Sequence, residues 1–158
     1  MTVSVAIPVL NGGTLLDEVL RAVRGQRGVG DSLELVVADS GSDDGSLDVA
    51  RRYEARVLSV GVGEFSHGGT RDLLMRSATG SRVAFLTQDA TPASADWLAS
   101  LLSGFSRADD VALVYGPYRP RPDAPHWVRR ELLEFFGDSP RVDRGSSSAF
   151  GVGLGTGL

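Results

Sequence analysis

A carboxylate, Asp39, follows directly after the apolar segment 33–38 and opens the polar segment 39–45, which reads Asp-Ser-Gly-Ser-Asp-Asp-Gly. At the end of a buried strand, such a group can accept a hydrogen bond from a nucleobase imide or a ribose hydroxyl. The same residues also suit an Asx-type turn that leads into a helix cap. The position after a predicted strand favours a binding role for Asp39.

A second acidic residue stands at the end of another apolar segment. Gln88 and Asp89 follow the segment 83–86, where a carboxylate is a suitable ligand for Mg²⁺ or Mn²⁺ carrying a diphosphate. These ions take few ligands from the protein, because phosphate oxygens and water supply the others. The alternative is that Asp89 only begins a turn before Thr91 and Pro92.

The segment 64–72, Glu-Phe-Ser-His-Gly-Gly-Thr-Arg-Asp, combines a glycine-rich loop with a predicted helix start. Backbone N–H groups there, together with Arg71 in the first helical turn, would suit phosphate oxygens. The alternative is an ordinary solvated arginine. His67 is interpreted as a hydrogen-bonding loop residue, because no nucleophile in the sequence pairs with it as in a catalytic triad.

Apolar segments alternate with helical patterns along most of the chain. The predicted strands are 3–10, 33–38, 57–60, 83–86 and 111–115. The first predicted helix runs from a Thr14-x-x-Asp17 capping box to Gly25. The others are predicted over about 46–53, 69–78, 94–102 and 127–136, with Ser94 as the cap of the helix 94–102.

This alternation predicts an α/β fold, a Rossmann-like, mainly parallel sheet flanked by helices. Ligands of such sheets bind beyond the carboxyl ends of the strands. Asn11, the segment 39–44 and the pair 88–89 all follow strand ends. We therefore expect them to face one crevice.

Composition excludes several kinds of chemistry. All 16 basic residues are arginine, so Walker A, pyridoxal and kinase sites, which need lysine, are excluded. The absence of cysteine, with only two histidines, excludes a Cys/His zinc site and a thiol nucleophile. A net charge of −4 argues against nucleic acid as a partner.

Patterns outside the predicted sheet concern the chain's organisation and location. No leader pattern and no apolar run of membrane-spanning length are present, so we expect a cytoplasmic protein, with peripheral association at the inner face of a membrane left open. The segment 116–144 holds a proline-dense arm and a helix, and 145–158 is a glycine- and serine-rich tail that we expect to be disordered.

Four motifs, in order, resemble those of the inverting family 2 glycosyltransferases, which have the GT-A fold. They are the opening strand and loop 5–11, the acidic element 37–45, Thr70-Arg71-Asp72, and Thr87-Gln88-Asp89 in place of the Asp-x-Asp metal motif. The segments 65–71, 86–92 and 115–122 are similar to the bacterial rhamnosyltransferase branch. The resemblance covers about residues 2–136.

The resemblance implies a nucleotide-diphosphate sugar as donor, with dTDP-rhamnose favoured, a saccharide or lipid-linked acceptor, and inversion during synthesis of a cell-surface polysaccharide. It implies Mg²⁺ or Mn²⁺ held by Asp89, with Arg71 offsetting charge on the leaving diphosphate. Residues 1–115 would form the donor-binding domain. The implied nucleotide-sugar-binding residues are Pro8, Asn11, Asp39, Arg71 and Gln88.

The general base of the family is not matched by any motif in this sequence. Five carboxylates are available, and none stands in the expected pattern: Asp109, Asp110, Asp123, Asp138 and Asp143. The chain also ends where the acceptor half should begin, so we expect a truncated form. Three hypotheses follow: a glycosyltransferase, a nucleotide-sugar-binding module without catalysis, and a receiver-like domain, which the absence of lysine disfavours.

Overall fold

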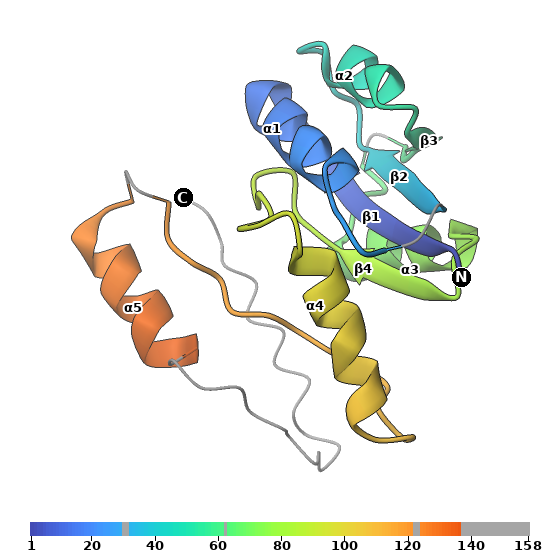
Figure 1. The fold of residues 1–158 in the computed structure, drawn as a ribbon. Helices are drawn as coiled ribbons and strands as arrows, with labels where there is room; N and C mark the ends of the chain where they lie inside the picture. The colour runs from blue at the N-terminus through green and yellow to red at the C-terminus, as the bar shows by residue number, and fades with distance from the viewer. Residues whose placement is uncertain (30–31, 62, 122–123, 137–158) are drawn as a thin grey trace. The chain divides into compact units, whose positions relative to one another are not determined.

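The computed structural model describes residues 1–29, 32–61, 63–121 and 124–136. The chain separates into two compact units, Met1–Gly116 and Pro117–Leu158. Within the first unit, a four-stranded parallel sheet has the order β3-β2-β1-β4 (Figure 1). Its strands are β1 (Val3–Val9), β2 (Leu33–Asp39), β3 (Arg56–Ser59) and β4 (Arg82–Phe85).

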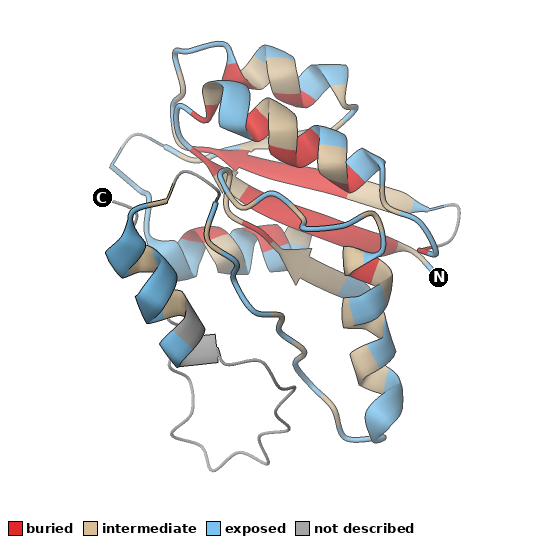
Figure 2. Ribbon diagram, turned by 60° about the vertical axis from the view of Figure 1, so that its left-hand side comes forward, coloured by how far each residue is buried: buried red, intermediate tan, exposed pale blue. Residues whose placement is uncertain are grey.

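The central strands β1 and β2 are nearly continuous apolar segments because both of their faces are covered. Figure 2 shows them as the most deeply buried strands of the fold. On one face, Val5, Ile7 and Val37 pack in a large cluster with side chains of helices α1 (Gly13–Arg24) and α2 (Ser46–Arg52). On the other face, a smaller cluster contains Leu74 of α3 (His67–Ser77).

Helix α1 buries one stripe of side chains against the sheet. Its buried residues recur at the helical spacing that the sequence pattern predicted: Leu16, Val19, Leu20 and Val23. The predicted capping box is wrong, because the helix begins at Gly13, before Thr14, and its N-cap is Gly12. The hydroxyl of Ser46, from the start of α2, accepts hydrogen bonds from the first N–H groups instead.

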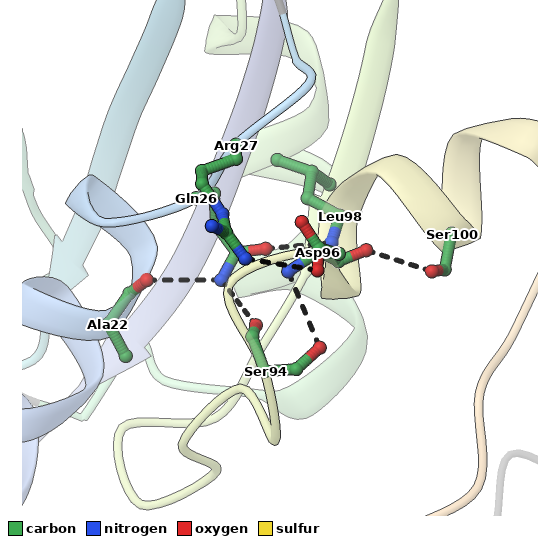
Figure 3. A network of polar contacts seen from close by, with 7 residues as sticks. All are labelled: Ala22, Gln26, Arg27, Ser94, Asp96, Leu98 and Ser100. Carbon is green, nitrogen blue, oxygen red and sulfur yellow. Dashed lines mark hydrogen bonds and ion pairs between the residues drawn. The ribbon is translucent and has the colours of Figure 1, made fainter.

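Helix α4 (Trp97–Ser103) begins three residues after its predicted Ser94 cap. The side-chain amide of Gln26 donates a hydrogen bond to the backbone carbonyl of Ser94 at 2.8 Å (Figure 3). The oxygen of this Gln26 amide accepts a hydrogen bond from the Leu98 N–H. This long-range bridge ties the start of α4 to the end of α1. A 3-10 helix, η1 (Gly104–Arg107), follows α4.

The predicted fifth strand over 111–115 is wrong. These residues have no strand partner in the described part of the chain, and the sheet of the first unit ends at β4. Leu113 and Tyr115 are 65% and 62% exposed, whereas Val114 packs closely on Gly104. Apolar composition suggested a strand here, but burial and ladder hydrogen bonds are needed to form one.

The second unit contains helix α5 (His126–Phe136), which confirms the helix predicted over 127–136. The predicted tail, 145–158, lies outside the described residues. Among the helices that the structure describes, none has the length and apolar character needed to cross a membrane.

Candidate functional site

The carboxyl ends of β1, β2 and β4 lie at one edge of the sheet, because the strands are parallel neighbours. The loop 10–13 after β1 lies between the other two strand ends. It forms hydrogen bonds with Gln88 on the β4 side and with Ser42 on the β2 side. The structure therefore brings Asn11, the segment 39–45 and Gln88 together, as the alternation of strands and helices predicted.

Asp39 is the last residue of β2 and is 6% exposed. Its Oδ2 atom accepts hydrogen bonds from the N–H groups of Gly41 and Ser42, both at 3.1 Å. Its Oδ1 atom is buried and has no partner among the described residues. One oxygen thus makes the Asx-type turn, while the other keeps its acceptor capacity. The predicted turn is confirmed, and the binding role of Asp39 stays a prediction.

A pocket of about 230 Å³ opens beside this strand end. The backbone N–H of Val60, which lines the pocket, donates to the carbonyl of Asp39 at 2.8 Å. Thr70, another lining residue, is 3% exposed, and its hydroxyl has no partner within the described ranges. The lining residues are Ser59, Val60, Glu64, Gly69, Thr70 and Leu73.

Sequence reasoning singled out Glu64, Gly69 and Thr70, within the segment 64–72, and missed the other three lining residues. Ser59 and Val60 end or follow the short strand β3, and Leu73 lies on the outer part of α3, so none of them stands out as a polar motif. For Ser59 and Val60, the position at a strand end was the available signal, since parallel sheets place such residues at the ligand edge.

Helix α3 starts earlier than predicted. Ser66 is its N-cap, and the serine hydroxyl accepts a hydrogen bond from the Gly69 N–H at 3.1 Å. The helix therefore begins at His67 instead of Gly69, and His67 is a helical residue whose ring lies 5.1 Å from that of Phe65. Arg71 falls in the second turn, which corrects its predicted place in the first turn.

Arg71 is partly buried, and its Nη1 donates to the carbonyl of His67 at 3.2 Å. This bond stays within one helix and occupies one donor of a guanidinium that carries five. The remaining donors can therefore serve an anion near the start of α3. The phosphate-binding role of Arg71 stays a prediction.

Pro8 lies in the central strand β1, where its missing N–H needs an explanation. The β1–β4 ladder ends where the N–H of Leu86 donates to the carbonyl of Ala6. Residues of one strand alternate between neighbours, so the N–H that Pro8 lacks would point to the β4 side, beyond the end of that ladder. Proline therefore removes no sheet hydrogen bond here.

Asn11 has a left-handed backbone, with a φ of 50°, which asparagine tolerates better than most residues. Its N–H donates to Ser42 Oγ at 2.9 Å, and its Oδ1 accepts from the N–H of Asp43 at 3.0 Å. The side chain is exposed. Asn11 thus joins the β1 loop to the β2 loop beside Asp39.

Asp89 is exposed and follows Gln88 at the β4 end of the same edge. The described residues contain no group of three or more His, Cys, Asp or Glu side chains that could hold a metal ion. A single accessible carboxylate suits Mg²⁺ or Mn²⁺ that arrives with a diphosphate, since phosphates and water complete the coordination. The ligand set therefore fits a metal bound together with its substrate.

The carboxylates considered as a general base stay unassigned. Asp109 and Asp110 are exposed and follow η1, and no described contact brings either to the site edge. The other three lie outside the described residues: Asp123, Asp138 and Asp143.

Comparison with known proteins shows the family to which this chain belongs. The model of glycosyl transferase family 2 matches residues 4–155. The O-antigen chain rhamnosyltransferase RfbN of Salmonella typhimurium is 34% identical over 126 residues, which are 78% of this chain and 39% of that protein. The chain thus spans less than half the length of this relative.

Solved structures agree in fold. Glucosyl-3-phosphoglycerate synthase from Mycobacterium tuberculosis, in complex with UDP, is 26% identical with a TM-score of 0.62 and covers 76% of this chain and 45% of its own. A mannosyltransferase from Pyrobaculum calidifontis, in complex with GDP-Man and Mn²⁺, is 29% identical with a TM-score of 0.57, over 66% of this chain and 32% of its own. The parallel sheet with its flanking helices is the GT-A fold, and the chain belongs to glycosyl transferase family 2.

Proposed function

We propose that this chain binds the nucleotide-sugar donor of a glycosyl transfer at the carboxyl edge of its sheet. The observation that carries the proposal is the buried Asp39, which keeps one oxygen without a partner in the described structure. An unsatisfied buried acceptor is costly, so such a group needs an explanation, and a bound ligand that donates a hydrogen bond supplies one.

Five of the six predicted site residues have a direct part in this proposal. Asp39 would accept a hydrogen bond from the base or ribose, Pro8 and Asn11 would shape the adjoining loop, and Arg71 would contact phosphate oxygens. Asp89 would hold Mg²⁺ or Mn²⁺, which offsets charge on the diphosphate when bound. The rhamnosyltransferase relative favours dTDP-rhamnose as the donor, in synthesis of a surface polysaccharide with a saccharide or lipid-linked acceptor and inversion at the sugar.

A second candidate function is donor binding without transfer. It is favoured because no described contact brings Asp109 or Asp110, the described candidates for the general base, to the site edge. In that case this segment would supply the donor half, and a further segment would supply the acceptor and the base.

Calorimetry tests the binding proposal. We expect dTDP to bind more tightly than UDP or GDP and more tightly still with Mn²⁺. Asp89→Ala should abolish the gain from Mn²⁺ and leave the metal-free affinity unchanged, because the exposed side chain has no described structural partner. An unchanged gain in this variant would reject Asp89 as the metal ligand.

Transfer and hydrolysis assays separate the two functions. With dTDP-rhamnose and Mn²⁺, release of dTDP would support an enzyme, whereas binding of dTDP without turnover would support the binding module. Failure of all three nucleotides to bind, with and without Mn²⁺, would contradict both.

A further inference from the structure

The loop 10–13, which ends in the first residue of α1, has all four of its backbone N–H groups bonded to side chains that follow β4 and β2 or begin α2. The N–H of Leu10 donates to Gln88 Oε1 at 2.8 Å, and the N–H of Asn11 donates to Ser42 Oγ at 2.9 Å. The N–H groups of Gly12 and Gly13 share Ser46 Oγ at 2.9 and 3.1 Å. In dinucleotide-binding folds, the N–H groups at this position bind phosphate, so the loop has another use here.

Gln88 closes the β4 side of this loop with both ends of its amide. Its Nε2 donates to the carbonyl of Leu10 at 2.9 Å, while its Oε1 accepts from the N–H of the same residue. The β1–β4 ladder has already ended, and Pro8 has no N–H to extend it. The amide therefore replaces the missing backbone rung, a task that needs one donor and one acceptor on the same group.

The close approach of Gln88 depends on Gly12. A Cβ atom at Gly12 would stand 3.2 Å from Gln88 Oε1 and 2.9 Å from Leu16 Cβ, so a larger residue would push the amide away. On the opposite side of the loop, Ser46 is 1% exposed, and its hydroxyl donates to Asp44 Oδ1. The loop is thus held from both sides in one position.

Resting on the proposed function, we propose that Gln88 is a positioning residue that fixes the metal ligand Asp89 relative to the nucleotide-binding loop. Asp89 is the next residue in the chain, and it is exposed beyond the end of β4, where no ladder bond holds it. A turn bond from the Ala90 N–H to the Thr87 carbonyl shapes this segment, and the two hydrogen bonds between Gln88 and Leu10 tie it to the loop.

The measurable consequence is the coupling between Mn²⁺ and nucleotide, defined as the ratio of dTDP affinity with and without the metal. In Gln88→Met, which loses both hydrogen bonds, we expect this ratio to fall about tenfold, the scale at which partners of metal ligands act. The metal-free dTDP affinity should stay within about twofold of the original, because Gln88 acts through Asp89. Gln88→Asn, too short to reach Leu10 yet still polar, should give the same loss and keeps the test usable if the methionine variant folds poorly.

Gln26→Met is the matched control. Gln26 also bridges two elements with its amide, through the carbonyls of Ala22 and Ser94 and the N–H of Leu98, at the far end of α1 (Figure 3). Its loss should lower the melting temperature while leaving the ratio unchanged. A purely structural role of Gln88 predicts that same result for Gln88→Met.

The double variant Gln88→Met/Asp89→Ala completes the experiment. We expect its dTDP affinity to equal that of Asp89→Ala alone, since positioning has no effect once the carboxylate is gone. An additional loss, or a fall in metal-free affinity, would overturn the proposal in favour of direct contact with the donor, and an unchanged ratio in Gln88→Met and Gln88→Asn would overturn it outright. If the original chain binds no nucleotide, the proposed function fails and this inference fails with it.

Discussion

Strand β2 carries two carboxylates whose surroundings differ: Glu34 near its start and Asp39 at its end. The Glu34 side chain is 16% exposed and accepts hydrogen bonds from the Ser4 hydroxyl, the Thr79 N–H at 2.8 Å and Arg56 at 3.0 Å. Burial raises the pKa of Glu34, but the bonds from Ser4, Thr79 and Arg56 outweigh it and lower the pKa to about 2.

Asp39 is the more deeply buried residue, yet one of its oxygens has no partner in the described structure. The difference follows from position, because Glu34 lies at the amino edge of the parallel sheet and Asp39 at the carboxyl edge, where ligands bind. A carboxylate whose oxygens are both satisfied holds the fold together. One that keeps a buried oxygen open is suited to bind a ligand.

Removing Glu34 should give the largest loss of stability. Glu34→Ala leaves the Thr79 N–H, the Ser4 hydroxyl and Arg56 without their shared acceptor, and we expect a loss of about 2 to 3 kcal/mol in the free energy of unfolding. Urea denaturation measures it. The control, Asp72→Ala, removes an exposed carboxylate paired with Arg76 and should leave stability nearly unchanged. Equal losses in the two variants would contradict a structural role for Glu34.

Acid should weaken the fold through the same group. The pKa of Glu34 is about 2 in the folded chain, against 4.5 ordinarily, so folding favours the charged form. Its contribution is complete above pH 4.5 and is lost as the pH falls toward 2. We expect this part of the loss to be about 2 kcal/mol, less than the whole shift implies because solvent reaches part of the side chain. Urea denaturation at several pH values between 2 and 6 gives the free energy of unfolding as a function of pH. We expect this free energy to change less steeply with pH in Glu34→Gln than in the original chain. Equal pH dependence in the two would refute the role of Glu34 in acid sensitivity.

Asp39→Asn should show the opposite behaviour, with a small effect on stability and a larger one on binding. The amide keeps an oxygen for the N–H groups of Gly41 and Ser42, so the free energy of unfolding should change by less than about 0.5 kcal/mol. The dTDP affinity should fall about tenfold, because a charged acceptor is lost. Calorimetry and denaturation of the same sample measure both. A large loss of stability with unchanged affinity would make Asp39 a second structural carboxylate.

Short-range patterns in the sequence predicted much of this fold. Strands β1 and β2 are apolar because both faces are buried, and the spacing of the apolar residues marked α1. The errors arose where distant contacts decide the outcome: Ser46 caps α1 in place of Thr14, Gln26 ties down Ser94 ahead of α4, and 111–115 lacks a strand partner. No local pattern contains that information.

The candidate site was predictable as a set of positions but not as an arrangement. Strand ends identified Asp39 and Asp89, because parallel strands expose their final residues at one edge. The pairing of Gln88 with Leu10 spans 78 residues of sequence. Which oxygen of Asp39 is hydrogen-bonded and which keeps its acceptor capacity depends on the turn that follows this residue. The sequence suggested that Gln88 binds the donor directly, whereas its contacts in the fold favour positioning.

Two serine variants compare the amino edge and the carboxyl edge of the sheet by removing one hydroxyl from each. Ser4 is fully buried and its hydroxyl accepts from the Gly80 N–H at 2.9 Å, so Ser4→Ala should cost about 1 to 2 kcal/mol by leaving that N–H and Glu34 short of partners. Ser42→Ala frees the N–H of Asn11 in an exposed loop, where water can replace the hydroxyl, so its cost should stay below about 0.5 kcal/mol. Denaturation of both variants measures this difference in stability. In dTDP calorimetry, Ser42→Ala should lose more affinity than Ser4→Ala, because Ser42 holds the loop beside Asp39 and Ser4 does not. If Ser42→Ala proved the more destabilising, the carboxyl edge would be as much a part of the structural core as the amino edge.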